Sequence, residues 1–164
     1  MILSGKHFVL LLLLCFSLDN SIGQNVAPAE PWAVGVRTSY GFLIPHRPVM
    51  RALITGHAAI GELYVERSSL GYRDWQRIHK LPQYGIAVCR INLGNPNQFG
   101  AATGAFPYIN FPLLGNGSVK WNLRTGAGLG YVDKPFDQDE NHHNVAIGSH
   151  INALIHVTSE LAFR

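Results

Sequence analysis

Bulky and small residues alternate along several stretches of the chain. Between Trp32 and Ile44, every second residue is bulky and mostly apolar, whereas the residues between them are mostly small or polar. Successive side chains of a β-strand point to opposite faces of a sheet, so this stretch predicts a strand with one apolar face. The same division recurs at Val119–Tyr131, less regularly at Val145–Phe163, and over a shorter length at Tyr84–Cys89.

Two weaker stretches bring the prediction to six strands. Gly56–Arg67 is one, although Glu62 and Glu66 blur its alternation. Phe99–Phe111 is the other, and it is interrupted by Pro107, which we expect at a bulge or near a strand end because proline cannot donate to a ladder. The expected connections are Pro45–Pro48, Ser68–Lys80, Leu93–Gln98, the glycine-rich turn Gly115–Ser118, and Asp133–Asn144.

A sheet with one apolar and one polar face fits two architectures. In a soluble sandwich the apolar face packs inward, whereas in a membrane β-barrel it meets lipid and the polar residues line the lumen. Several of the expected strands have about 10 residues or more, against an average of about 5–6 in globular proteins, which favours the barrel. Glycines gather on the presumed lumen face. Aromatic residues stand near strand ends, as interfacial girdles require: Trp32, Tyr40, Tyr131 and Phe163.

These features predict an all-β fold, an antiparallel membrane β-barrel over residues 32–164. Closed bacterial barrels have an even number of strands and at least eight, so two strands beyond the six found here are expected to complete it. The two longer, charged connections, Ser68–Lys80 and Asp133–Asn144, are expected on the outer side of the membrane.

Residues 1–23 have the pattern of a secretory signal peptide. Lys6 provides the positive charge, and Phe8–Phe16 is an uninterrupted apolar run. Ser21 and Gly23 are the small residues at the two positions that a signal peptidase reads, so cleavage is expected before Gln24. The apolar run is far shorter than the ~20 residues of a membrane-spanning helix. We therefore expect export, with residues 24–31 forming a polar linker ahead of the barrel.

Composition and charge exclude other classes. Only 14% of the 164 residues are charged, against about 25% in ordinary soluble domains, and the 10% of aromatic residues does not fit disorder. The net charge of +3 is dispersed rather than gathered in a basic stripe, so nucleic-acid binding is not expected. Cys15 leaves with the signal peptide, so Cys89 has no partner for a disulfide, and we assign it no role.

Several short motifs follow one another along the chain. They are Thr55-Gly-His57, Glu66-Arg67, Gly71, Trp75, Pro82, Tyr84-Gly85, Gly104-Ala-Phe-Pro-Tyr108, Arg124-Thr-Gly-Ala-Gly-Leu-Gly-Tyr131 and Asn144-Val-Ala-Ile-Gly-Ser-His-Ile-Asn-Ala153. In their order and spacing these motifs resemble the first part of the lipid A 3-O-deacylase-related proteins, one large branch of which is labelled acyloxyacyl hydrolases. The resemblance runs from about Trp32 to the last residue, and its individual motifs are loose.

The resemblance implies an eight-stranded barrel in the outer membrane of a Gram-negative bacterium, which hydrolyses an ester-linked acyl chain of lipid A without a metal or organic cofactor. It implies lipid A, as part of lipopolysaccharide, and outer-membrane lipid as partners. In such proteins the catalytic His and Ser lie in a His-x-Ser-Asn motif on one strand, followed by an acidic residue. Positions i and i+2 share a strand face, so the His can accept the Ser proton while the carboxylate orients the imidazole.

The catalytic motif does not occur in this sequence, because none of its eight His is followed by x-Ser-Asn. In the family the motif lies about one hairpin after the strand that here contains His150. We therefore expect it beyond Arg164, carry over no catalytic residue, and expect this chain alone to be inactive.

Two groups are weak substitutes for the motif. Ser149 and His150 are neighbours, and adjacent strand residues face opposite sides, so they are not expected to pair. His156 and Thr158 have the i, i+2 spacing, with Glu160 further along the same face. This second group lacks the following Asn and precedes the family motif in register, so polar filling of the lumen is the favoured interpretation.

The residues of the last expected connection, Asp133–Asn144, could also indicate a metal site. His142 and His143 lie close in sequence to Asp137, Asp139 and Glu140. The group lacks the fixed ligand spacing of zinc sites, so we interpret it as a solvated loop and expect no metal.

Two functional hypotheses follow from the sequence. The first is a lipid A deacylase-like carboxylic ester hydrolase of the outer membrane, of which this chain lacks the catalytic motif. The second is a non-catalytic structural or binding β-barrel of the same membrane. A His-x-Ser-Asn motif followed by an acidic residue separates the first hypothesis from the second.

Overall fold

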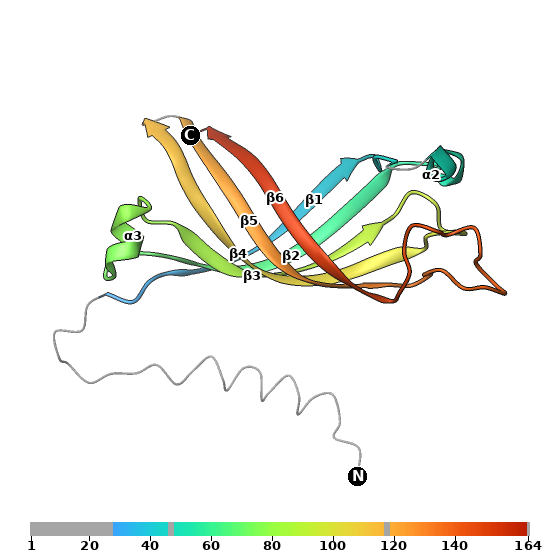
Figure 1. Cartoon of the computed structure of the whole chain (residues 1–164). Helices are drawn as coiled ribbons and strands as arrows, with labels where there is room; N and C mark the ends of the chain where they lie inside the picture. The colour runs from blue at the N-terminus through green and yellow to red at the C-terminus, as the bar shows by residue number, and fades with distance from the viewer. Residues whose placement is uncertain (1–27, 46–47, 117–118, 164) are drawn as a thin grey trace, which may run out of the picture.

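The fold is a curved antiparallel sheet of six strands, seen in a computed structural model that describes residues 28–45, 48–116 and 119–163 (Figure 1). The predicted signal peptide lies outside these residues. Each strand pairs with its neighbours in the sequence, which confirms the all-β antiparallel prediction. The elements are β1 (Trp32–Gly41), α2 (Pro48–Leu53), β2 (Ala58–Ser68), α3 (Asp74–Ile78), β3 (Gln83–Asn92), β4 (Ala101–Asn116), β5 (Val119–Val132) and β6 (Ile151–Phe163).

The two short helices mark the two ends of the sheet. Helix α3 joins β2 to β3 at one end, where β1 also begins; helix α2 follows β1 at the other end (Figure 1). We call these the α3 end and the α2 end. In the described residues, no helix is long and apolar enough to cross a membrane.

The prediction that both long connections share one side was wrong. The connection that contains α3 lies at the α3 end, whereas residues 133–150 lie at the α2 end (Figure 1). Consecutive antiparallel strands reverse direction, so the connection after β2 and the connection after β5 must emerge at opposite ends.

Strand β6 begins later than the sequence predicts. Its pairing with β5 starts at Ile151 rather than at Val145, because the preceding residues bond within their own loop. Val145 N–H donates to the His143 carbonyl over 2.9 Å, and Phe136 N–H donates to the Ile147 carbonyl over 2.6 Å.

Pro107 lies neither at a bulge nor near a strand end. It pairs with Ile86 of β3 in the middle of β4. On the other side, the pairing of β4 with β5 passes from Ala105 to Tyr108 without a change of register, which accommodates a residue that has no N–H. The irregularity of β4 lies instead between Pro112 and Leu114.

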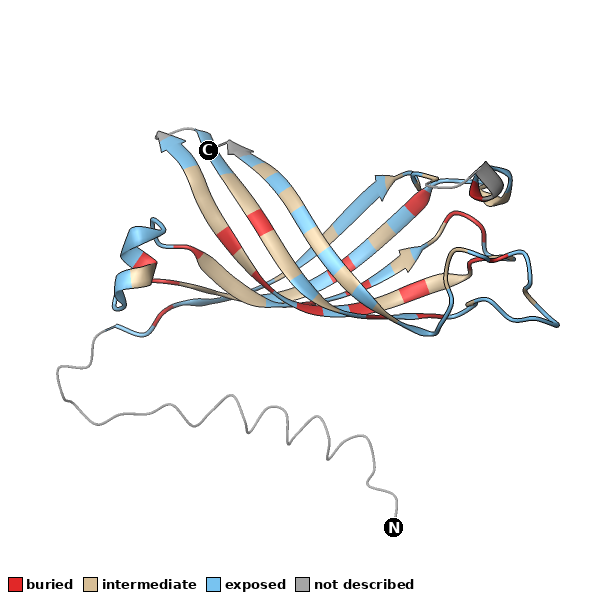
Figure 2. Cartoon of the chain, viewed as in Figure 1, coloured by how far each residue is buried: buried red, intermediate tan, exposed pale blue. Residues whose placement is uncertain are grey.

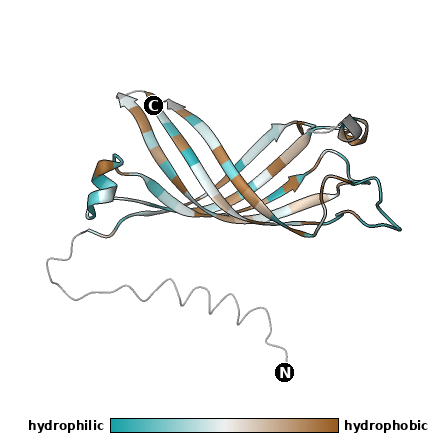
Figure 3. Ribbon diagram, in the orientation of Figure 1, coloured by the Kyte–Doolittle hydropathy of each residue, from teal (hydrophilic) through white to brown (hydrophobic). Residues whose placement is uncertain are grey.

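Buried and exposed residues alternate along the strands (Figure 2), as do hydrophilic and hydrophobic residues (Figure 3). The charged side chains that meet across the sheet lie on its inner, concave side, and the exposed apolar residues of the strands lie on its outer, convex side. A small apolar cluster also lies on the concave side, built around Ala87, Cys89, Phe106 and Tyr108. Glycines on this face leave room for neighbouring side chains and strands. A Cβ on Gly35 would collide with the Tyr64 ring, and a Cβ on Gly128 would collide with the backbone of Ala105 and Phe106. Of the glycines predicted for the lumen face, Gly35, Gly126 and Gly128 thus stand where space is short, whereas a Cβ on Gly41 would meet nothing within 4 Å.

Candidate functional site

Four charged side chains from four strands meet on the concave face. Arg124 of β5 donates to Glu62 of β2 over 2.6 Å, and their side chains are 1% and 4% exposed. Arg37 of β1 lies 3.6 Å from the same Glu62 and 2.8 Å from Glu160 of β6. The two positive charges of the arginines balance the two negative charges of the glutamates, and buried charges require such pairing. We call Arg37, Glu62, Arg124 and Glu160 the charge network.

Aromatic rings surround the buried arginine of the charge network. The Arg124 guanidinium carbon lies 3.5 Å from the centre of the Tyr108 ring and 5.5 Å from that of Tyr64. The Arg124 Nε and Nη2 atoms have no hydrogen-bond partner among the described residues. The faces of the two rings attract the cation there, so stacking takes the place of some hydrogen bonds.

The structure brings His156 and Thr158 together. Thr158 Oγ1 and His156 Nε2 are 2.8 Å apart, the separation at which the imidazole can accept the hydroxyl proton. His156 also stacks on Phe106, with ring centres 4.8 Å apart and planes at 22°. The i, i+2 spacing therefore brings the two side chains into hydrogen-bond contact.

Glu160 does not complete a triad with this pair. Its carboxylate is engaged by Arg37, and no contact with His156 is found in the part of the chain that the structure describes. Without a carboxylate on the second ring nitrogen, the imidazole of His156 has nothing to fix its tautomer for base catalysis.

Ser149 and His150 do not pair, for a different reason from the one the sequence indicates. Both precede β6, so the alternation of strand faces does not apply to them. The Ser149 hydroxyl donates to the Ile151 carbonyl over 2.6 Å, and His150 Nδ1 donates to the Val132 carbonyl over 2.8 Å. Each side chain is held by the backbone.

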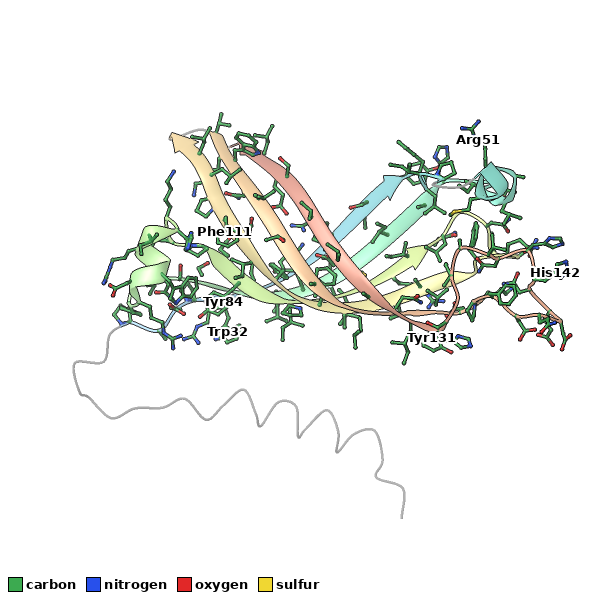
Figure 4. All side chains as sticks on the ribbon, in the orientation of Figure 1. Trp32, Arg51, Tyr84, Phe111, Tyr131 and His142 are labelled. Carbon is green, nitrogen blue, oxygen red and sulfur yellow. The ribbon has the colours of Figure 1, made fainter. Side chains whose placement is uncertain are left out.

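The loop with paired histidines lies at the α2 end, near the label of His142 in Figure 4. The His142 and His143 rings have centres 3.9 Å apart. Asp137 Oδ1 accepts the backbone N–H groups of Asp139 and Glu140, and the bonds from Glu140 and then Asp139 lower the pKa of Asp137. Among the described residues, no group of three His, Cys, Asp or Glu side chains is arranged to hold a metal.

A second polar centre lies at the α3 end, and no pattern in the sequence indicates it. Glu30, which falls in the expected linker, is 6% exposed. Tyr84 donates to its carboxylate over 2.7 Å, Gln76 of α3 donates over 2.6 Å, and Arg67 lies 3.1 Å away. The Tyr84 bond is the largest cause of a lowered Glu30 pKa. Trp32 and Tyr84 mark this end in Figure 4.

Comparison of the chain with protein-family models, curated proteins and solved structures finds no match.

Proposed function

We propose that the sheet is part of an outer-membrane β-barrel, with its convex face in lipid and its concave face lining the lumen. This proposal rests on the distribution of apolar and charged residues, which is the reverse of that in a soluble protein: apolar side chains are exposed and charged side chains are buried. On the convex face, Val34 is 77% and Ile155 is 81% exposed, whereas Arg124 and Glu62 on the concave face are almost fully buried. Soluble proteins rarely expose so continuous an apolar surface, and lipid is the solvent that accepts it.

Aromatic residues at the two ends of the convex face support the same assignment. At the α3 end, Trp32 is 66% and Trp121 is 39% exposed. At the α2 end, Tyr40 is 76% and Tyr131 is 50% exposed. Two such bands, separated by aliphatic residues, match the aromatic girdles at the two surfaces of a bilayer.

The ion pair between Arg37 and Glu160 supports closure by two further strands. Strands β1 and β6 run antiparallel, so an even number of inserted strands keeps every neighbour antiparallel. Two inserted strands need three spacings of about 4.8 Å, or about 15 Å in total, which is close to the full reach of an arginine and a glutamate that meet at their tips. Eight strands, the smallest number in bacterial barrels, thus fit the gap.

We further propose that this barrel belongs to a lipid A deacylase-like ester hydrolase. The resemblance of the sequence motifs supports this step, and the catalytic His-x-Ser-Asn motif is not among the residues of this chain. The alternative is a non-catalytic structural or binding barrel. Glu160 is bound to Arg37 and leaves His156 without a carboxylate, so His156 and Thr158 do not form a substitute catalytic site.

Two experiments test the two levels of the proposal. The full-length protein that contains this chain, purified from its native membrane, should require detergent for extraction and should migrate faster on gels before heating than after. Recovery as a soluble monomer would refute the membrane assignment. The same preparation is then incubated with purified lipid A, and released fatty acid is measured by mass spectrometry. Release supports the hydrolase. A folded, heat-modifiable protein that releases none supports the non-catalytic barrel.

A further inference from the structure

A pocket of about 470 Å³ opens on the concave side at the α3 end. It lies between the residues that follow α3, the start of β3, and the hairpin of β4 and β5, away from the gap between β1 and β6. Its polar lining residues are Ser68, Lys80, Gln83, Asn110, Lys120 and Asn122.

The charged side chains that line the pocket are all positive. Residues 28–163 contain three lysines, and two of them, Lys80 and Lys120, line this pocket together with no acidic residue. Lys80 Nζ donates to the Leu113 carbonyl over 3.0 Å, which leaves two of its three protons for another acceptor. No hydrogen bond from Lys120 is found in the described chain. The third lysine, Lys134, lines a different pocket at the α2 end.

A buried amide in the wall of the pocket has an unused acceptor. The Asn110 amide group donates to Gln83 Oε1 over 3.3 Å, and the Gln83 amide donates to Ser68 Oγ over 3.3 Å. Asn110 is 6% exposed, and its Oδ1 atom accepts no hydrogen bond among the described residues. A buried acceptor of this kind needs a donor, and a simple inorganic anion supplies few or none.

We propose that this pocket binds a small anionic sugar, such as a sugar phosphate. Asn and Gln side chains each offer donors and an acceptor, and these match the hydroxyl groups of a sugar ring, one of which would donate to Asn110 Oδ1. The two lysines bind the anionic group. A neutral sugar would leave the lysines without an anion, and a bare anion would leave Asn110 without a donor. This binding is independent of the proposed ester hydrolysis.

Lysine acetylation tests the proposal, because the third lysine serves as an internal control. The full chain, folded in detergent micelles with a β-sheet circular dichroism spectrum, is acetylated with and without glucose 6-phosphate, and each site is quantified by mass spectrometry. We expect the sugar phosphate to slow modification of Lys80 and Lys120 several-fold and to leave Lys134 unchanged. Glucose and inorganic phosphate at the same concentration should protect the two lysines less.

Variants measured by calorimetry complete the test. Lys120→Gln and Asn122→Ala should each weaken glucose 6-phosphate binding about tenfold, whereas Lys134→Gln should bind as the parent chain does. Equal protection of all three lysines, or of none, would overturn the proposal. Phosphate that protects as well as the sugar phosphate would also overturn it, since the amides would then have no part in recognition.

Discussion

Arg37 and Glu160 form an ion pair across the concave face, although they lie in the two strands at opposite edges of the sheet. Their Nη2 and Oε1 atoms are 2.8 Å apart, and their side chains are 28% and 23% exposed. Strands β1 and β6 share no ladder in the described residues. The sheet is therefore curved enough for side chains of its two edge strands to form an ion pair.

The coupling energy of this pair can be measured by a double-mutant cycle. We expect Arg37→Gln and Glu160→Gln together to destabilise the sheet by about 1 kcal/mol less than the sum of the single changes, the upper range for a half-buried pair. Urea unfolding in micelles, followed by heat-modifiability, gives the four stabilities. Additive changes would mean that the two edges are held in place by other contacts.

The buried pair of Arg124 and Glu62 should be much more sensitive to removal of one partner. Arg124→Met leaves the Glu62 carboxylate buried beside Arg37 alone, and we expect a loss of about 3–5 kcal/mol. The double change Arg124→Met with Glu62→Met removes both charges and should recover part of that loss. If the double variant is less stable than Arg124→Met, the surrounding rings rather than the charges control this region.

A charge placed on the convex face distinguishes lipid from water. Ile155→Arg lies near the middle of β6, where the side chain is 81% exposed, and it should cost about 2–4 kcal/mol if that position lies at the bilayer midplane. Tyr131→Arg, at a strand end, should cost about 0–1 kcal/mol by the same depth dependence. In a water-exposed sheet the first change would be nearly neutral.

Acid should release the segment that contains Glu30. Its pKa is lowered in the folded state, first by the hydrogen bond from Tyr84. The resulting stabilisation is present at neutral pH and is lost as the pH falls below the ordinary carboxyl pKa of about 4.3. Fluorescence of Trp32 and Trp75 should report the release. Glu30→Gln should remove this transition while leaving the far-ultraviolet circular dichroism unchanged; a transition that persists in the variant belongs to another group.

This chain by itself should not deacylate lipid A. The sequence does not contain the His-x-Ser-Asn motif that the resemblance implies for catalysis, and Glu160 is not available to orient His156. The refolded chain is incubated with lipid A, and fatty acid is measured by mass spectrometry. Release that is abolished by His156→Ala or Thr158→Ala would show that the pair is a working site. Release that survives both changes would locate the site elsewhere.

The sequence predicts features that depend on neighbouring residues, and it does not predict contacts between residues far apart along the chain. The period of two is clear where the two faces of a strand meet different environments, as in β1 and β5, and it is blurred by Glu62 and Glu66 in β2. The contact of His156 with Thr158 follows from spacing alone. Helix α3 spans only Asp74–Ile78, too short to show a helical period. The contacts of Glu30 with Tyr84 and of Glu62 with Arg124 join residues far apart in the sequence, so only the folded sheet reveals them.

The unbroken order of the strands has a kinetic consequence. Because every ladder joins neighbours in the sequence, each hairpin can form as soon as its own two strands are present, at a small cost in loop-closure entropy. Assembly can then proceed as a succession of local steps from β1 to β6. The meeting of Arg37 with Glu160 requires all of these steps, so that ion pair reports the end of the process and not its nucleus.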